Sequence, residues 1–488
     1  MTVNNQDNSQ TNAPSLLEPQ SRGGDIAEGG INFQAEVILS FLPQWLRMDG
    51  FTSMVRENMA DFEAKFFIPG HGYKKEFIEV KNHLVRPAEF WHEIERFKQM
   101  ERAVGDEYQW FTLTSAGLHQ DLHPLVHSLR RIRDPYDFYE NSRILESSYS
   151  EYLERVRGLG KSDEDAEFLF NKVWILSDLS HARDAGKALF KQSLTENLPQ
   201  YGDLPTRILD DIYSEVSTFI KGKGIQTVTR LELESSLRTP IPENLLPPVS
   251  PIHIHTAINE IETDADKTAL RFDWAEFFAG ENRNYPPPEV WNERMIGKLL
   301  EAKNWILERR STRRIFLTGN RRLSASLAIG SIFSAVAGFS VDMQQREQVF
   351  PTNAHAAPET ANYQIQLQRF GNEKGERLIV SIGIIRDVVP EVDEYIQKQG
   401  LNDLPRLHIK GDAPIVSPEQ ANLVTGKIKS LISENVVQSG AKQIDLFIAA
   451  PAFLALFLGH RLNATAPVQC YERVAAGQYE PTCLLFNK

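Results

Sequence analysis

Cysteine is almost absent from this sequence, and so are long apolar runs and an excess of positive charge. The two cysteines, Cys470 and Cys483, are too few for a disulfide framework or a four-thiolate zinc site, which favours a reducing compartment. The most apolar stretch, 444–458, is too short and too interrupted to span a bilayer, and the first thirty residues are polar where a secretory signal needs an apolar segment. We therefore expect no membrane span, a cytoplasmic location and a disordered tail over residues 1–20.

The formal net charge of −12 argues against a protein that binds nucleic acid over its whole surface, because such proteins are typically basic. Any DNA contact must therefore be local. The basic residues that crowd one segment are Lys65, Lys74, Lys75, Lys81, Arg86, Arg96, Lys98 and Arg102, followed by Arg130, Arg131 and Arg133. They form either a small DNA-binding patch or, as is more typical of such a run, a solvated face of mixed charge.

The chain is long enough for two or three domains, and one segment marks a boundary between them. Residues 239–251 carry five prolines in thirteen positions, which neither a helix nor a central strand accommodates. We place an N-terminal domain at 21–240 and a C-terminal domain at 250–488.

The N-terminal domain begins with residues 31–47, whose apolar spacing predicts a helix. Two strand-like runs, 61–68 and 76–82, are separated by a turn that contains proline and glycine, so they predict a hairpin. The elements predicted after this hairpin are a helix at 87–103, a strand at 108–114 and further helices to about residue 223.

The C-terminal domain alternates strands and helices, which predicts an α/β sheet with crossover helices. A weak internal repeat at an offset of 129 residues pairs Gly330 with Gly459, so we expect two similar lobes, about 250–350 and 363–488, around a pseudo-twofold axis. Ligands of open α/β sheets bind at the carboxyl ends of strands, next to helix N-termini, so the cleft between the lobes is the predicted ligand site. The predicted strands lie near 314–318, 339–344, 377–384, 406–409, 444–449, 468–471 and 482–486.

One pattern in the predicted hairpin points to phosphodiester hydrolysis, which needs carboxylates for a divalent metal and a nearby cation. Asp61 precedes Glu79 and Lys81, and strand alternation places Glu79 and Lys81 on one face. If the hairpin turns around His71, Asp61 lies opposite Lys81 and diagonal to Glu79. Glu-x-Lys alone is a weak signal, because it also occurs at 63–65 and 301–303, where it is not in the second strand of a hairpin that begins with Asp. The alternative interpretation of Glu79 and Lys81 is an exposed ion pair on a strand.

Other polar residues near this pattern are open to two interpretations. Glu57 is either a further metal or water-positioning carboxylate or a solvated helix-end residue. Gln34, on the leading helix, either approaches the site or faces water. Lys98 and Gln99 either contact DNA phosphates or lie on the surface. The histidines His119, His123 and His127 recur at helical spacing, but a proline interrupts their face, which favours surface or capping roles over zinc.

These segments together resemble a known family. The stretches FDWAEFFAG, IFLTGNRRLSASLAIG, LFIAAPAFLALFLGHRL and VQCYER, within 250–488, are similar to the SAVED domain, a cyclic-oligonucleotide sensor made of two fused CARF-like lobes. GGINFQAEV, VRENMADFEA and FIEVKN, within 20–240, are similar to endonuclease domains of the PD-(D/E)XK superfamily, although Ala60 stands where a proline often precedes the acidic residue. The chain thus resembles bacterial CBASS antiphage effectors that fuse the two.

The resemblance implies an α/β fold with a restriction-endonuclease-like core and helical extension, followed by two Rossmannoid lobes. It also implies a function. A partner nucleotidyltransferase of the CD-NTase type makes a cyclic oligonucleotide, such as a cyclic trinucleotide, which the sensor binds. Protomers then associate into a homo-oligomer, and the nuclease degrades double-stranded DNA with Mg²⁺ or Mn²⁺.

The same resemblance suggests which residues carry these activities. The metal ligands fall on Asp61 and Glu79, with Lys81 beside them. The expected ligand-contacting residues of the sensor are Asn320, Arg321, Arg322, Arg386, Asp387, Pro451, Ala452 and Phe453. Ordinary alternatives remain, since Arg321 and Arg322 fit solvated first-turn residues and Phe453 fits a core residue or a platform for base stacking. The alternative for the whole chain is a catalytically inactive nucleotide-binding scaffold that recruits a partner.

Overall fold

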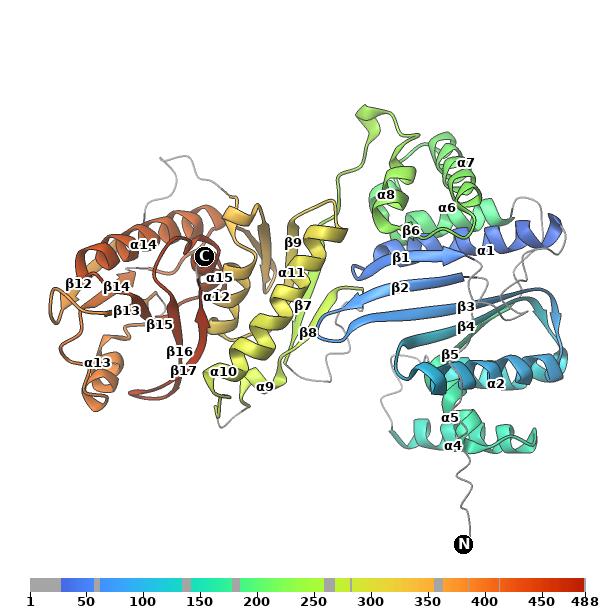
Figure 1. Ribbon diagram of the computed structural model, residues 1–488, viewed down its shortest axis with the longest axis horizontal. Coiled ribbons are helices and arrows are strands. Elements are labelled where there is room, and N and C mark those ends of the chain that lie inside the picture. Colours follow the sequence, from blue (N-terminus) through green and yellow to red (C-terminus); the bar gives the residue numbers. More distant parts are fainter. Residues whose placement is uncertain are drawn as a thin grey trace, which may run out of the picture. The chain divides into compact units, whose positions relative to one another are not determined.

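The proline-rich segment 239–251 contains the point at which the computed structural model divides into two units, Met1–Pro248 and Val249–Lys488 (Figure 1). Each unit is an α/β structure with its own sheet or sheets, as the sequence predicts. No helix in the described part of the chain is long and apolar enough to cross a membrane. The structure describes residues 28–56, 62–133, 142–177, 185–258, 268–280, 283–354, 363–384, 386–411 and 413–486.

The first unit has one six-stranded mixed sheet in the order β5-β4-β3-β2-β1-β6. Strands β1, β2 and β3 form an antiparallel meander, and β4 and β5 continue it in parallel with β3. The elements are α1 (Glu28–Arg47), β1 (Phe51–Arg56), β2 (Phe62–Ile68), β3 (Gly72–Val85), α2 (Pro87–Val104), β4 (Tyr108–Leu118), α3 (His123–Arg133), α4 (Ser142–Gly158), α5 (Asp163–Lys172), β5 (Val173–Leu176), α6 (Ala185–Asn197), α7 (Thr206–Lys223), β6 (Val228–Thr229) and α8 (Arg230–Arg238).

Helices cover both faces of this sheet (Figure 1). One core joins α1, α6, α7 and α8 to the face that carries Ile78 and Val80. A second core joins α2, α3, α4 and α5 to the face that carries Phe77. The apolar positions that predicted α1, such as Val37, Ile38 and Leu42, are buried in the first core.

The hairpin of β2 and β3 forms, but its register differs from the prediction. Ile68 pairs with Gly72 and Phe62 pairs with Ile78, whereas a turn around His71 required Phe62 opposite Val80. The reason is the turn, in which Gly70 and Gly72 both adopt positive φ and close the hairpin one residue earlier. The predicted positions Glu57 and Asp61 lie outside the described residues.

The second unit contains two sheets. The first has the order β11-β10-β9-β7-β8, and the second has the order β12-β14-β13-β15-β16-β17. In the first sheet β8, β7, β9 and β10 are parallel, and the edge strand β11 is antiparallel to β10. In the second sheet the four central strands are parallel, and the edge strands β12 and β17 are antiparallel to their neighbours. The elements are β7 (Ile252–Ala257), β8 (Leu270–Asp273), α9 (Ala275–Phe278), α10 (Pro288–Val290), α11 (Gly297–Arg309), β9 (Arg314–Gly319), α12 (Leu323–Ile332), β10 (Ser340–Gln345), β11 (Gln348–Pro351), β12 (Ile365–Phe370), β13 (Arg377–Gly383), α13 (Val389–Lys398), β14 (Arg406–Gly411), α14 (Pro418–Ser439), β15 (Gln443–Ala449), α15 (Ala452–Arg461), β16 (Val468–Ala475) and β17 (Gln478–Leu485).

The two lobes meet at a pair of glycines that the internal repeat aligns. A Cβ atom at Gly330 of α12 would overlap the carbonyl oxygen of Leu456, and one at Gly459 of α15 would overlap that of Leu327. The contact is reciprocal, since Leu327 and Leu456 also differ by the repeat offset of 129. The equivalent helices α12 and α15 therefore cross at close range, as two lobes related by a pseudo-twofold axis require.

Candidate functional sites

The predicted pair on β3 faces α2. Strand alternation places Glu79 and Lys81 on the face of Phe77, and Ile78 and Val80 in the opposite core, as the sequence predicts. Gln34 lies on α1, the helix that covers the Ile78 face. The described contacts therefore do not bring Gln34 together with Glu79 and Lys81.

Two residues of α2 complete the surroundings of this pair. Lys81 Nζ lies 2.9 Å from Glu79 Oε1 and 2.9 Å from Glu93 Oε1. Arg96 contacts the other oxygen of Glu79 through Nη2, and its Nε lies 3.0 Å from Glu93 Oε2. The four side chains are only 7 to 19 % exposed, so they form a buried ring of alternating charge. We call this ring, Glu79–Lys81–Glu93–Arg96, the β3–α2 cluster.

Electrostatics in the β3–α2 cluster keep Lys81 charged. Burial alone would lower the pKa of the Lys81 ammonium, but Glu79 and Glu93 outweigh burial and raise that pKa above its ordinary value. Lys81 is therefore a fixed cation at neutral pH, which is the property that charge stabilisation at a phosphate requires.

The donor set of this cluster suits one class of metal. Glu79 and Glu93 offer carboxylate oxygens without a neighbouring thiolate, which are ligands for Mg²⁺ or Mn²⁺, and Mg²⁺ commonly binds through one or two carboxylates with water and substrate phosphate. Within the described ranges, no group of three histidine, cysteine, aspartate or glutamate side chains is placed to hold a metal. A site at Glu79 therefore needs a further ligand, and the predicted one, Asp61, lies outside those ranges.

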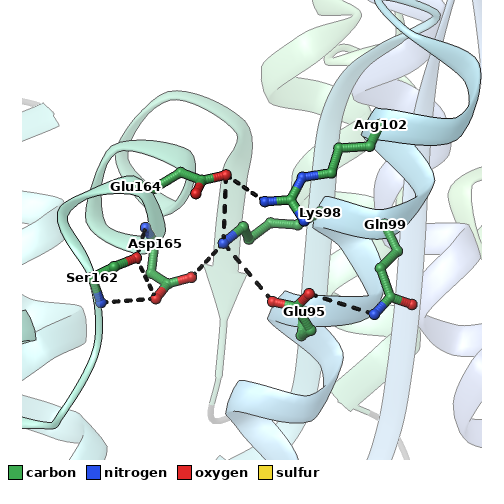
Figure 2. A network of polar contacts seen from close by, with 7 residues as sticks. All are labelled: Glu95, Lys98, Gln99, Arg102, Ser162, Glu164 and Asp165. Carbon is green, nitrogen blue, oxygen red and sulfur yellow. Dashed lines mark hydrogen bonds and ion pairs between the residues drawn. The ribbon is translucent and has the colours of Figure 1, made fainter. Parts of the chain in front are cut away.

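Most of the basic side chains in this segment form ion pairs within the protein, and Figure 2 shows those of Lys98 and Arg102. Lys98 is buried and lies 2.6 Å from Asp165, and Arg102 lies 2.5 Å from Glu164, so α2 is tied to the start of α5. Gln99 donates to Glu95 on its own helix. These contacts contradict a DNA-contacting role for Lys98, because its ammonium is already paired with carboxylates.

The second basic group and the histidines also have structural roles. Arg130 and Arg133 of α3 donate to backbone carbonyls of β5 and α5, at Ile175 and Phe170. His119 accepts a hydrogen bond from a backbone N–H at the start of a helical turn, in the capping role that the sequence favours.

In the second unit, Arg321 is the most unusual of the predicted ligand residues. It follows β9, and its Nη1 donates to Thr318 O at 3.0 Å and to Thr256 Oγ1 at 3.1 Å. Among the described residues no carboxylate pairs with it, and its buried Nε has no hydrogen-bond partner. Burial lowers the pKa of Arg321 to about 9, since no anion offsets the loss of water. Arg321 is thus a largely buried cation that lacks a described counter-ion.

Arg322 and Asn320 flank Arg321 at the start of α12. Arg322 donates to Phe278 O from Nε and Nη2, at 3.1 and 2.6 Å, and its guanidinium lies 3.8 Å from the centre of the Phe278 ring. Arg322 is therefore not a solvated first-turn residue, which was the alternative that the sequence left open. Asn320 is exposed, and its backbone N donates to Thr256 O.

The N-terminus of α12 is occupied by a carboxylate that the sequence analysis missed. Glu472 of β16 accepts a hydrogen bond from Ser324 N at 2.7 Å. Burial raises the pKa of Glu472, although the contact with Ser324 opposes this shift. Its neighbour Arg473 contacts Glu391 at 2.6 Å, so consecutive residues of β16 connect α12 of one lobe with α13 of the other.

The loop after β13 lies at the same sheet edge as the loop after β15, because Gly383 pairs with Ala449. Arg386 pairs with Glu391 at 2.7 Å, and Glu391, which also holds Arg473, has its pKa lowered to about 2 by these two arginines. Asp387 accepts from Lys410 Nζ at 2.9 Å. Both predicted residues are therefore paired within the lobe.

The loop after β15 leads to Phe453, whose surroundings differ from those expected of a base-stacking residue. Pro451 and Ala452 are half-buried at the start of α15. Phe453 is buried, and its ring stacks on Phe350 at 4.0 Å with an angle of 5°. The predicted role of Phe453 as a platform for a base does not fit this packing, because Phe350 already covers a face of its ring.

Comparison with known proteins finds one matching family model and two relatives that align along nearly the whole chain. Residues 299–485 match the family model described as "SMODS-associated and fused to various effectors sensor domain", or SAVED. The chain is 27 % identical over 475 residues to CD-NTase-associated protein 4 of Moraxella osloensis, and 26 % identical over 476 residues to the protein of that name from an Acinetobacter species. Each match covers 96 % of this chain and 99 % of the relative.

Solved structures agree with the fold. The Cap4 SAVED/CARF-domain containing receptor of Acinetobacter baumannii with the cyclic trinucleotide 3'3'3'-cAAA has a TM-score of 0.81 and 24 % identity, covering 94 % of this chain and 99 % of that one. The receptor of the same description from Moraxella osloensis has a TM-score of 0.77 and 25 % identity, covering 94 % and 100 %. The α/β fold of this chain is therefore that of Cap4 receptors along nearly its whole length.

Proposed function

We propose that this chain is an effector of CBASS antiphage signalling whose SAVED domain, within residues 250–488, binds a cyclic oligonucleotide and thereby activates a nuclease domain within residues 21–240. The match of residues 299–485 to the SAVED model supports the sensor. Structures of similar receptors with cyclic trinucleotides favour a cyclic trinucleotide as the ligand. The full-length similarity to CD-NTase-associated proteins supports a CD-NTase nucleotidyltransferase as the functional partner in the cytoplasm.

The observation that most supports the proposed ligand site is that Arg321 is largely buried and has no counter-ion among the described residues. A largely buried guanidinium without a described counter-ion is unfavourable by itself, and an anion that enters beside it supplies the missing charge. Arg321 follows the carboxyl end of a parallel strand, where ligands of α/β sheets bind. A cyclic oligonucleotide brings one phosphate per nucleotide, so it fits this position.

For the nuclease, we propose that Glu79 and Asp61 hold the divalent metal, Mg²⁺ or Mn²⁺, with Glu57 and Gln34 as further candidates in the site. The metal, when bound, supplies a water of lowered pKa and neutralises charge on the phosphate. Lys81 places its ammonium beside Glu79 and attracts the scissile phosphate of double-stranded DNA. Glu93 holds Lys81 in that position through its contact at 2.9 Å.

A nucleotide-binding scaffold without nuclease activity is the second candidate. The observation that favours it is that both oxygens of Glu79 already contact cations, Lys81 and Arg96. A scaffold of this kind binds its ligand and recruits a partner but cleaves no DNA.

The two functions are separated by plasmid cleavage with Mg²⁺ in the presence of a panel of cyclic di-, tri- and tetranucleotides. The nuclease proposal expects cleavage only with an activating ligand, and no cleavage by Lys81→Ala, which keeps ligand binding because Lys81 lies outside the sensor. Lys303→Ala alters a Glu-x-Lys sequence on α11 and serves as the matched control, with cleavage unchanged. Ligand binding by the natural protein without cleavage under Mg²⁺ or Mn²⁺ establishes the scaffold instead.

A further inference from the structure

Arg96 is the member of the β3–α2 cluster that touches both carboxylates from the helix. Lys81 contacts Glu79 through Oε1, and Arg96 contacts Glu79 through the remaining oxygen, Oε2. Arg96 is also held independently of Glu79. Its Nε lies 3.0 Å from Glu93 on its own helix, and its guanidinium lies 5.6 Å from the ring centre of Phe77.

The charges of this cluster balance without a metal. Two carboxylates and two cations cancel, and all four side chains are largely withdrawn from water. A divalent ion that binds Glu79 adds two positive charges close to Lys81 and Arg96. Because charges interact strongly where water is excluded, this repulsion opposes metal binding for as long as Arg96 stays on Glu79.

We propose that Arg96 is a built-in competitor of the divalent metal at Glu79. The guanidinium contacts Oε2 of Glu79, and the metal binds that oxygen once Arg96 has left Glu79 while it keeps its contact with Glu93. This inference rests on the proposed nuclease function. Since Glu93 and Arg96 both belong to α2, a small displacement of α2 relative to β3 separates Arg96 from Glu79 without breaking its pair with Glu93. The contacts of Lys98 and Arg102 with α5, shown in Figure 2, hold α2 in place.

The test is calorimetric titration of the full-length protein with Mn²⁺, without DNA or nucleotide. Arg96→Gln removes the competing charge and is expected to bind Mn²⁺ about tenfold more tightly or better than the natural protein. Arg96→Lys keeps the positive charge, so its Mn²⁺ affinity is expected to stay within about threefold of that of the natural protein. Arg157→Gln, an exposed arginine of α4 that pairs with Asp163 outside the cluster, is the control and should leave the affinity unchanged.

An affinity of Arg96→Gln equal to or weaker than that of the natural protein, with the same thermal unfolding profile, overturns the competitor role while the nuclease proposal stands. If neither protein binds Mn²⁺, the metal part of the proposed function fails as well. If Arg96→Gln does not fold, crystals of the natural protein grown with and without Mn²⁺ decide the question. The proposal expects Arg96 to leave Glu79 and keep Glu93 when Mn²⁺ is bound, and Mn²⁺ on a Glu79 that still contacts Arg96 refutes it.

Discussion

Arg321 is the residue on which the proposed ligand site most depends, because no counter-ion for its charge is found among the described residues. Its Nη1 is bonded to Thr318 and Thr256, but no carboxylate among the described residues offsets its charge. Holding a desolvated cation in this way is unfavourable to folding, and the protein recovers that free energy when an anion binds.

We therefore predict that Arg321→Gln weakens binding of the activating cyclic oligonucleotide by about tenfold to a hundredfold, the usual effect of losing a hydrogen bond to a charged group. Calorimetry with the activating member of the panel measures this. Arg313→Gln, an exposed residue before the opposite end of β9, is the control and should bind normally. An unchanged affinity for Arg321→Gln would show that its charge is not used for the ligand.

At the scale of elements, the crossing of α12 and α15 is the contact that joins the two lobes. Gly330→Ala places a methyl group against the carbonyl oxygen of Leu456, and such overpacking costs about 1–3 kcal/mol. We expect a lower midpoint of thermal unfolding for the second unit. Gly426→Ala, in α14 where a Cβ meets open space, is the control and should be neutral or stabilising by up to about 1 kcal/mol. Equal stability of the two variants would contradict the close crossing.

The same helix pair carries a titratable group. His460 of α15 is buried and donates from Nδ1 to Phe333 O at the end of α12, and burial lowers its pKa to about 4. The folded protein keeps this imidazole neutral, whereas the unfolded chain binds a proton below its ordinary value of 6.5. This group therefore favours the folded state above pH 6.5, and that contribution is lost as the pH falls from 6.5 to about 4.

We predict that the free energy of unfolding of the second unit falls over this pH range by up to about 3 kcal/mol more in the natural protein than in the His460→Gln variant. Denaturant unfolding at a series of pH values measures the difference. His92→Gln, an exposed position on α2, should behave like the natural protein. Parallel curves for the natural protein and His460→Gln would mean that His460 does not titrate in this way.

Several elements with a buried apolar face were predicted from the sequence, but β1 and β7 were not, although both are largely buried. The strand predicted near 444–449 forms β15, which is largely buried. Strand β12, IQLQRF, was also missed, because it is a short edge strand that is mostly exposed and its apolar alternation covers only four residues. The hairpin register was missed because it depends on the backbone of two glycines.

The candidate sites divide in a similar way. Glu79 and Lys81 were found because both lie on one strand, where alternation fixes their common face. Glu93 and Arg96 were missed because their contact with β3 is tertiary, and no spacing along the chain reports it. Glu472 was overlooked for the same reason, since its partner Ser324 comes from the other lobe.

At the scale of the whole molecule, charge limits how one protomer binds DNA. The net charge is −12, and basic residues such as Lys74 and Lys98 pair with Asp106 and Asp165 instead of solvent. Under the proposed function, a first unit whose described basic residues are largely paired binds DNA weakly at physiological salt, and linking several such units through ligand-induced assembly would raise the effective affinity. Assembly must in turn tighten ligand binding, because the two equilibria are linked.

We predict that at saturating ligand the cleavage rate per protomer rises with protein concentration and falls steeply with added salt. Light scattering should show larger species only with the activating nucleotide, and an inactive cyclic nucleotide from the panel is the control. If the ligand-bound, fully active protein is monomeric on DNA, the assembly mechanism is wrong, and activation must come from a conformational change within one chain.

The contacts at the start of α12 also determine when the second unit of a newly made chain can finish folding. Ser324 donates to Glu472 and contacts Thr482 and Cys483, all of which belong to the last strands of the chain. Domains fold from the N-terminus during translation, so the first unit leaves the ribosome long before these partners exist. A chain that stops before β17 thus carries the first unit together with a helix whose first turn lacks these partners. The second unit can therefore be completed only after β17 has been made.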